Sequence, residues 1–354
     1  MAEVLLTGVT HYPPLMGRDE DMSWVLRWTL EDPDIPADAK NPASWPARMQ
    51  SEWSDDCGRA AAAAHRASLL EGFGAVRRAI DEFQPDVIVM FGDDQNENFQ
   101  QDGIPAFGLL AYDQFDTEPW KRARFPNVWD EPTDLARTVS GHRSAGVEFA
   151  TELIQDDFDI VYAYQPLHYP GLSHAFLNAV LLLDYDRTGF SYPLVPITVN
   201  CYGRRVVSFG GGLSRFADRA KPFDPPSPNP SRCFQLGAAV ARAARRSSLR
   251  VAIVASSSWS HAFLTDHTWR LWPDIPADER LYRALVSGDA DVFLSTTTAD
   301  IEAAGQQEVL NWFCLAGAAD ELSVTPAWSS LVDTHLFNSN KVFAVYPPAA
   351  REPA

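Results

Sequence analysis

The chain has 354 residues, of which 46% are hydrophobic and 21% charged, so it is long enough to bury a substantial core. Its net charge of −18 argues against a general nucleic-acid binder and against an anionic membrane surface as partner, because both need a basic face. No apolar run reaches the roughly 18 residues of a membrane helix, and no basic segment precedes a long apolar one at the N-terminus. With four scattered cysteines and no CxxC spacing, these features predict a cytoplasmic protein with reduced thiols.

Strand-like apolar runs alternate with helix-like segments along the chain. In chain order, the predicted strands lie at 3–9, 85–94, 158–164, 194–203, 250–258 and 341–348, and the predicted helices at 58–83, 139–155, 233–246, 280–287 and 298–318. The alternation predicts a single α/β domain over 1–354, with a central, mostly parallel or mixed sheet covered by helices on both faces. Loop insertions are expected near 20–57, 115–135 and 204–232.

Polar side chains follow several of the predicted strands. Ligands of open α/β sheets bind outside the carboxyl ends of the strands, so these side chains are candidate site residues. They are His11, Asp93, Asp94, Gln95, His168, His174, Asn200, Tyr202 and His261. Four of the predicted strands are followed by a histidine or a carboxylate at the same edge of the predicted sheet, although the chain has only eight histidines. Simpler interpretations are a turn cap for His11 and a solvated turn for the aspartate pair.

Three other kinds of site find little support in the sequence. Ser258 and Ser260 stand near His261, but there is no GxSxG elbow, and adjacent residues rarely form a catalytic pair. The segment "SFGGGLSRF" has neither a Walker lysine nor a Rossmann spacing. No HExxH motif or Cys/His cluster indicates a structural zinc ion.

The order of these motifs resembles the class III extradiol dioxygenases, typified by the catalytic subunit of protocatechuate 4,5-dioxygenase. The resemblance extends over most of the chain, through "GVTHYPPL", "PDVIVMFGDDQNENFQQDGIPAFGL", "YPGLSHAFLNAVLLL", "PLVPITVNCYG", "VAIVASSSWSHAF" and "GQQEVLNWFCLAGA". It implies an iron-binding histidine at His11 and an iron-binding glutamate at Glu308. It also implies a catalytic base at His261 and, at His174, a histidine that contacts substrate or oxygen.

One position departs from the family pattern. The prototype has a second iron-binding histidine after the acidic residue of its second motif, where this chain reads "GDDQ". Asp94 falls nearest to that position and is the predicted third ligand beside His11 and Glu308. The alternatives are Asp93, Gln95, His65 or His168, or a metal site that is altered or lost.

The resemblance implies an Fe(II)-dependent enzyme that cleaves the ring of a catechol-type substrate with O₂. A site with one histidine and two carboxylates is harder than the prototype and also suits Mn(II). The candidate substrate-binding residues are His168, Asn200, Tyr202 and Arg204, although Arg204 and Arg205 also read as a solvated basic pair. The insertions at 20–57 and 204–232 could replace a small partner subunit, and a homodimer is expected.

Two further hypotheses stay open at the level of sequence. The same strand-end histidines and carboxylates could hold Zn²⁺ and hydrolyse an amide or ester. Alternatively, the missing second histidine would suit a metal-free binding protein on the same fold.

Overall fold

The computed structural model describes residues 3–121 and 123–350. The strands are β1 (Glu3–Val9), β2 (Val87–Asp93), β3 (Phe107–Leu110), β4 (Gln114–Thr117), β5 (Arg137–Ser140), β6 (Val161–Ala163), β7 (Leu194–Val199), β8 (Val251–Ser256), β9 (Trp328–Val332), β10 (Lys341–Val345) and β11 (Ala349–Ala350). The α-helices are α1 (Trp24–Leu30), α2 (Ala37–Lys40), α3 (Ala47–Trp53), α4 (Arg59–Phe83), α5 (Arg143–Gln155), α6 (His174–Leu183), α7 (Pro230–Arg246), α8 (Ile275–Ser287), α9 (Ala290–Ser295), α10 (Thr298–Ala303) and α11 (Leu310–Glu321).

A nine-stranded mixed sheet runs through the molecule in the order β6-β3-β7-β2-β8-β1-β10-β9, with β11 paired to β1. Its centre, β7-β2-β8-β1, is parallel, whereas β3 is antiparallel to β7 and β10 is antiparallel to β1. The four central strands are buried along almost their whole length, which explains their continuous apolar runs. The predicted α/β class with a mixed sheet is confirmed.

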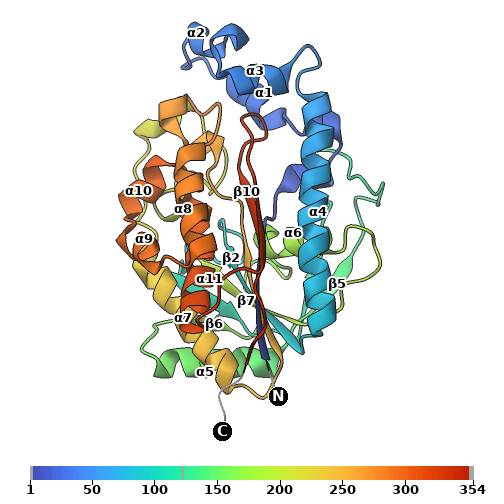
Figure 1. Cartoon of the computed structure of the whole chain (residues 1–354), viewed down its shortest axis with the longest axis vertical. Coiled ribbons are helices and arrows are strands. Elements are labelled where there is room, and N and C mark those ends of the chain that lie inside the picture. Colours follow the sequence, from blue (N-terminus) through green and yellow to red (C-terminus); the bar gives the residue numbers. More distant parts are fainter. Residues whose placement is uncertain (1–2, 122, 351–354) are drawn as a thin grey trace.

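Helices cover both faces of the sheet (Figure 1): α4 and α6 lie on one side, and α7, α8 and α11 on the other. Side chains of β8 alternate between the two faces of the sheet, and the core is divided accordingly. Val251 and Ile253 pack with α7 and α11 on one face, whereas Val254 packs with α4 and α6 on the other. Helices α7 and α11 approach very closely at Gly317, where an added Cβ would lie 1.9 Å from the carbonyl oxygen of Phe234.

The structure differs from the predicted elements in two ways. The segment 298–318 forms two helices, α10 and α11, because Gly305 adopts a left-handed φ of 65° and the chain turns there. This turn places Glu308 in the 3₁₀ turn Gln307–Val309, ahead of α11. Several elements were not predicted, namely β3, β4, β5, β9, β11, α9 and the short helices α1 to α3, which occupy the expected insertion at 20–57. Within the described residues, no helix is long and apolar enough to span a membrane.

Candidate metal centre

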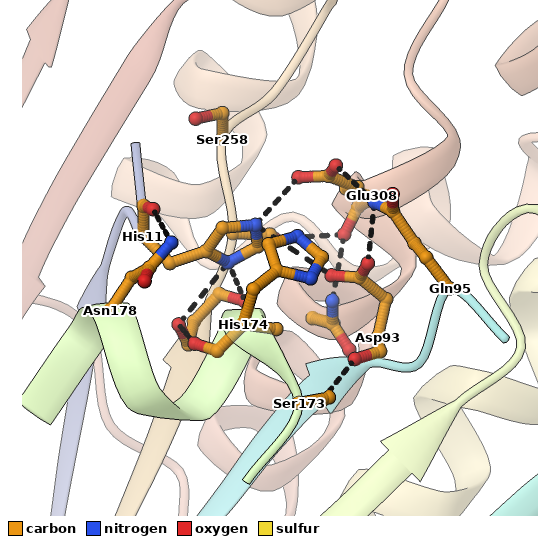
Figure 2. Close-up of polar contacts among 12 residues, drawn as sticks. His11, Asp93, Gln95, Ser173, His174, Asn178, Ser258 and Glu308 are labelled. Carbon is orange, nitrogen blue, oxygen red and sulfur yellow. Dashed lines mark hydrogen bonds and ion pairs between the residues drawn. The ribbon is translucent and has the colours of Figure 1, made fainter. Parts of the chain in front are cut away.

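His11 lies at the centre of a buried polar cluster, two residues beyond the end of β1 (Figure 2). Its Nδ1 lies 3.0 Å from the carbonyl oxygen of Ser256, at the end of the neighbouring strand β8. A carbonyl only accepts, so Nδ1 carries the hydrogen and the lone pair of Nε2 stays free. Burial lowers the pKa of His11 to about 4, although Asp93 opposes the shift. The ring is therefore a neutral imidazole with one nitrogen available as a ligand.

Two buried carboxylates face this nitrogen. Nε2 of His11 lies 3.8 Å from Oδ1 of Asp93, the last residue of β2, and 3.4 Å from Oε2 of Glu308. The other oxygen of each carboxylate is held: Gln95 donates to Oδ2 of Asp93 at 2.9 Å, and the Tyr202 hydroxyl donates to Oε1 of Glu308 at 2.7 Å. Within residues 3–121 and 123–350, neither Oδ1 of Asp93 nor Oε2 of Glu308 has a hydrogen-bond partner.

These unpartnered oxygens identify the chemistry that the cluster needs. Burial, and then the charge of Asp93, raises the pKa of Glu308 well above its ordinary value. A buried carboxylate oxygen without a donor is costly, and two around one free imidazole nitrogen are what a cation would satisfy. Two ligand atoms, each about 2.1 Å from one ion, lie at most about 4.2 Å apart. Both distances from His11 Nε2, 3.4 and 3.8 Å, fall within that limit. Among the described residues, the three whose ligand atoms all lie within 4.8 Å of one another are His11, Asp93 and His174.

His174, the first residue of α6, borders the same cluster. Its ring meets that of His11 edge-on at 5.0 Å, and one ligand atom each of His11, Asp93 and His174 lies within 4.8 Å of the others. Its Nδ1 lies 2.7 Å from Oε2 of Glu97. Burial lowers the pKa of His174, but Glu97 outweighs it, with help from Asp93 and Glu308, and raises the pKa to about 10. Sequence reasoning missed Glu97, although it belongs to the acidic "GDDQNENF" turn.

His261 lies on the other side of Glu308. Its Nε2 is 3.5 Å from Oε1 of Glu308, and its backbone N–H donates to the carbonyl oxygen of Gly305 at 2.8 Å. Burial lowers the pKa of His261 to about 3, with smaller contributions from the neighbouring His11 and Lys341. The imidazole is therefore neutral at neutral pH.

Residues 224–345 match the family described as the catalytic LigB subunit of aromatic ring-opening dioxygenase. The matched segment contains His261 and Glu308, whereas His11, Asp93 and His174 precede it. The predicted resemblance to ring-opening dioxygenases is confirmed for this segment. A crystal structure of an uncharacterized protein, JW3007 from Escherichia coli K12, is 12% identical, with a TM-score of 0.42 over 75% of this chain and 91% of that chain. No curated protein matches the sequence.

A cleft of about 620 Å³ leads from the surface to His174. Its walls combine aromatic side chains with charged ones, among them Trp24, Trp120, Phe125, Lys121, Arg124 and Tyr169. The size and the mixed lining suit a small organic molecule. The cleft ends at His174, whose side chain is 27% exposed.

Asp93, and not the predicted Asp94, faces His11. The carboxylate of Asp94 accepts hydrogen bonds from the backbone N–H groups of Glu97 at 2.8 Å and Asn98 at 2.9 Å. It therefore caps the turn that follows β2, as aspartate commonly does, and this role turns it away from the cluster. The structure therefore places Asp93, and not Asp94, against His11.

The four predicted substrate-binding residues have different surroundings. His168 lines the cleft, with its Nε2 2.7 Å from Oδ1 of Asp102. Tyr202 does not line the cleft and instead holds Glu308, as described above. Asn200 accepts from the backbone N–H of Gly203 at 3.0 Å and so caps a turn.

Arg204 lies outside the cleft. It is half-exposed and pairs with Glu302, with Nε 3.0 Å from Oε1, so the interpretation as a surface basic residue describes it better. His65, one of the alternative ligands, is also elsewhere, because its ring packs in α4 against Phe337 at a centroid distance of 5.0 Å.

Proposed function

We propose that the chain is an Fe(II)-dependent extradiol dioxygenase that opens the ring of a catechol-type substrate with O₂. The observation that carries this proposal is the pair of unpartnered buried oxygens, on Asp93 and Glu308, around the free Nε2 of His11. The family match over residues 224–345 supports aromatic ring opening as the chemistry that such a centre serves.

His11, Asp93 and Glu308 would hold the ion. One imidazole nitrogen and two carboxylate oxygens suit Fe(II) or Mn(II) better than a soft ion. A bound ferrous ion would supply the binding of the diol and the redox chemistry with O₂ that ring opening needs. Ser256, Gln95 and Tyr202 orient the three ligands, since each bonds the ligand atom that does not face the ion.

His261 accepts a proton as the substrate binds. A catechol hydroxyl binds more strongly as the phenolate, so a neutral base beside the centre promotes binding and prepares the ring for attack. His261 is buried and neutral, and its Nε2 is 3.5 Å from Glu308. It returns the proton as the ring opens.

His174 contacts the substrate from the side of the cleft. Its Nδ1 is fixed by Glu97, which leaves Nε2 as the nitrogen that meets a ligand. The pairing with Glu97 also keeps His174 positively charged, and this charge stabilises the negative charge that develops on the substrate oxygens. The aromatic walls of the cleft hold the ring of the substrate and exclude water from the buried side.

The test begins with anaerobic loading of the purified protein with Fe(II), followed by gallate, protocatechuate and substituted catechols in turn, and then O₂. We expect O₂ uptake and a yellow ring-opened product with at least one substrate, and none with the Zn²⁺-loaded protein. Oxygen-independent ester or amide hydrolysis by the Zn²⁺-loaded protein would instead support the hydrolase hypothesis. Failure to bind any divalent ion would support the metal-free binding protein.

A further inference from the structure

Asp278 is a fully buried carboxylate outside the cluster of His11, Asp93, His174 and Glu308. It lies in the first turn of α8, a helix of the layer that packs on the side of α7 and α11. The mechanism above does not use it. Its hydrogen bonds nevertheless connect it to the loops that carry His261 and Glu308.

Three loops donate hydrogen bonds to this one carboxylate. The backbone N–H of Ser260 lies 3.1 Å from each of its two oxygens. The side-chain amide of Gln306 donates to Oδ1 at 2.6 Å, and that of Asn340 donates to Oδ2 at 2.7 Å. All of these partners are donors, and each of the two carboxylate oxygens accepts from them.

Two of the loops carry residues of the centre. Ser260 immediately precedes His261, and Gln306 stands two residues before Glu308. Asn340 closes the arrangement, because its backbone also pairs with this segment: its N–H donates to Ser260 at 3.2 Å, and its carbonyl accepts from Trp259 at 2.9 Å. The separation of 3.5 Å between His261 and Glu308 thus depends on loops that meet at Asp278.

Such a carboxylate is expensive to bury. Burial raises the pKa of Asp278 to about 7, against the opposing effect of its hydrogen bonds from Gln306, Asn340 and Ser260. The negative charge of Asp274 also contributes to this raised pKa. An apolar residue at this position would avoid the cost of desolvation. The cost indicates that the carboxylate is retained for the geometry that it imposes.

We infer that Asp278 is a positioning residue, which holds the His261 loop and the Glu308 loop in register so that base and metal ligand face the same substrate. The inference rests on the proposed function for the roles of His261 and Glu308. The hydrogen bonds on which it depends are independent of that function.

The experiment compares Asp278→Asn with the matched control Asp274→Asn. Asparagine at 278 turns an amide N–H toward one of the N–H groups that now donate to the carboxylate. Asparagine at 274 keeps the oxygen that accepts from the backbone N–H of Ala277 at 3.1 Å. For Asp278→Asn we expect kcat to fall at least tenfold with KM changed less than twofold. Amide hydrogen exchange, measured without substrate, should accelerate at least tenfold in 257–264 and 304–310 and stay unchanged in 143–155. Asp274→Asn should show neither effect.

A second variant, Gln306→Met, removes one of the three donors and leaves the carboxylate in place. Exchange should then accelerate in 304–310 and not in 257–264. Unchanged exchange in both segments of Asp278→Asn, or equal acceleration throughout the chain, would overturn the positioning role. Because exchange needs no turnover, an inactive wild-type protein would refute the dioxygenase proposal and leave this test intact.

Discussion

Nε2 of His11 lies 3.4 Å from Oε2 of Glu308, although the two residues come from opposite ends of the chain. Parallel pairing of β1 with β8 brings the first half of this contact into place, since His11 follows β1 and bonds the end of β8. The turn at Gly305 supplies the other half by directing Glu308 inward. The proposed centre therefore depends on the whole sheet.

Replacing Glu308 by glutamine should remove most of the metal affinity. The variant keeps the shape of the side chain and its contact with Tyr202 but loses the charge that an ion requires. We expect Fe(II) affinity to fall at least 100-fold, measured anaerobically by titration and by metal analysis. Glu302→Gln, which alters a surface pair with Arg204, is the control. Full iron occupancy in Glu308→Gln would refute the assignment of this ligand.

The two adjacent aspartates should respond differently to the same change. Asp93→Asn should lose metal binding, because its unpartnered oxygen is the proposed ligand atom. Asp94→Asn should keep metal binding and lose about 1 kcal/mol of stability, because asparagine keeps only one of the two oxygens that accept backbone hydrogen bonds in this turn. Metal content and urea unfolding of both variants decide between them. The reverse pattern would restore Asp94 as the ligand.

His261→Ala should bind Fe(II) with wild-type affinity and lose turnover. The loss of a general base costs about 10²- to 10⁴-fold in rate. Single-turnover kinetics with a bound catechol measure this step separately from metal loading. A His261→Ala protein that retains the wild-type rate would exclude it as the base.

His174→Ala tests which groups bind the ion. We expect metal affinity to persist while KM for the catechol rises and kcat falls, because His174 borders the cleft and is fixed by Glu97. Glu97→Gln should produce a weaker version of the same effect. Loss of the metal from His174→Ala would instead mean that His11, Asp93 and His174 form the ligand set.

The stability of metal-free protein should carry a pH dependence from Asp278. Its folded-state pKa of about 7 lies above its ordinary 3.8, so the folded protein retains a proton between these values that the unfolded chain has released. Stability therefore falls as pH rises through this window. From pH 5 to pH 9 the wild type should lose about 3 kcal/mol that Asp278→Asn does not lose. Urea unfolding at both pH values measures the difference, and a constant difference would contradict the shift.

The sequence was most informative at the buried parallel strands. Their apolar runs are continuous because both faces are covered, so β1, β2, β7 and β8 and the polar residues that follow them could be located from the sequence. By contrast, β9 is an edge strand with every residue half-buried, and it lacks such a run. The short β3 has only four residues.

The sequence does not reveal which of the two adjacent aspartates faces His11. Asp93 and Asp94 are the same residue type at adjacent positions, and only the backbone hydrogen bonds of the following turn decide which one faces His11. Similarly, the side chain of Arg204 turns toward Glu302, a contact with a residue far along the chain. The predicted homodimer stays a prediction, for which sedimentation of the purified protein is the measurement.

The central claim is that His11, Asp93 and Glu308 hold one ion. Crystals grown anaerobically with Fe(II), with anomalous diffraction recorded at the iron edge, test it directly. The account predicts a single iron peak about 2.1 Å from Nε2 of His11 and from one oxygen of each carboxylate. An iron peak at another place in the protein, or one too far from Glu308 for coordination, would contradict it.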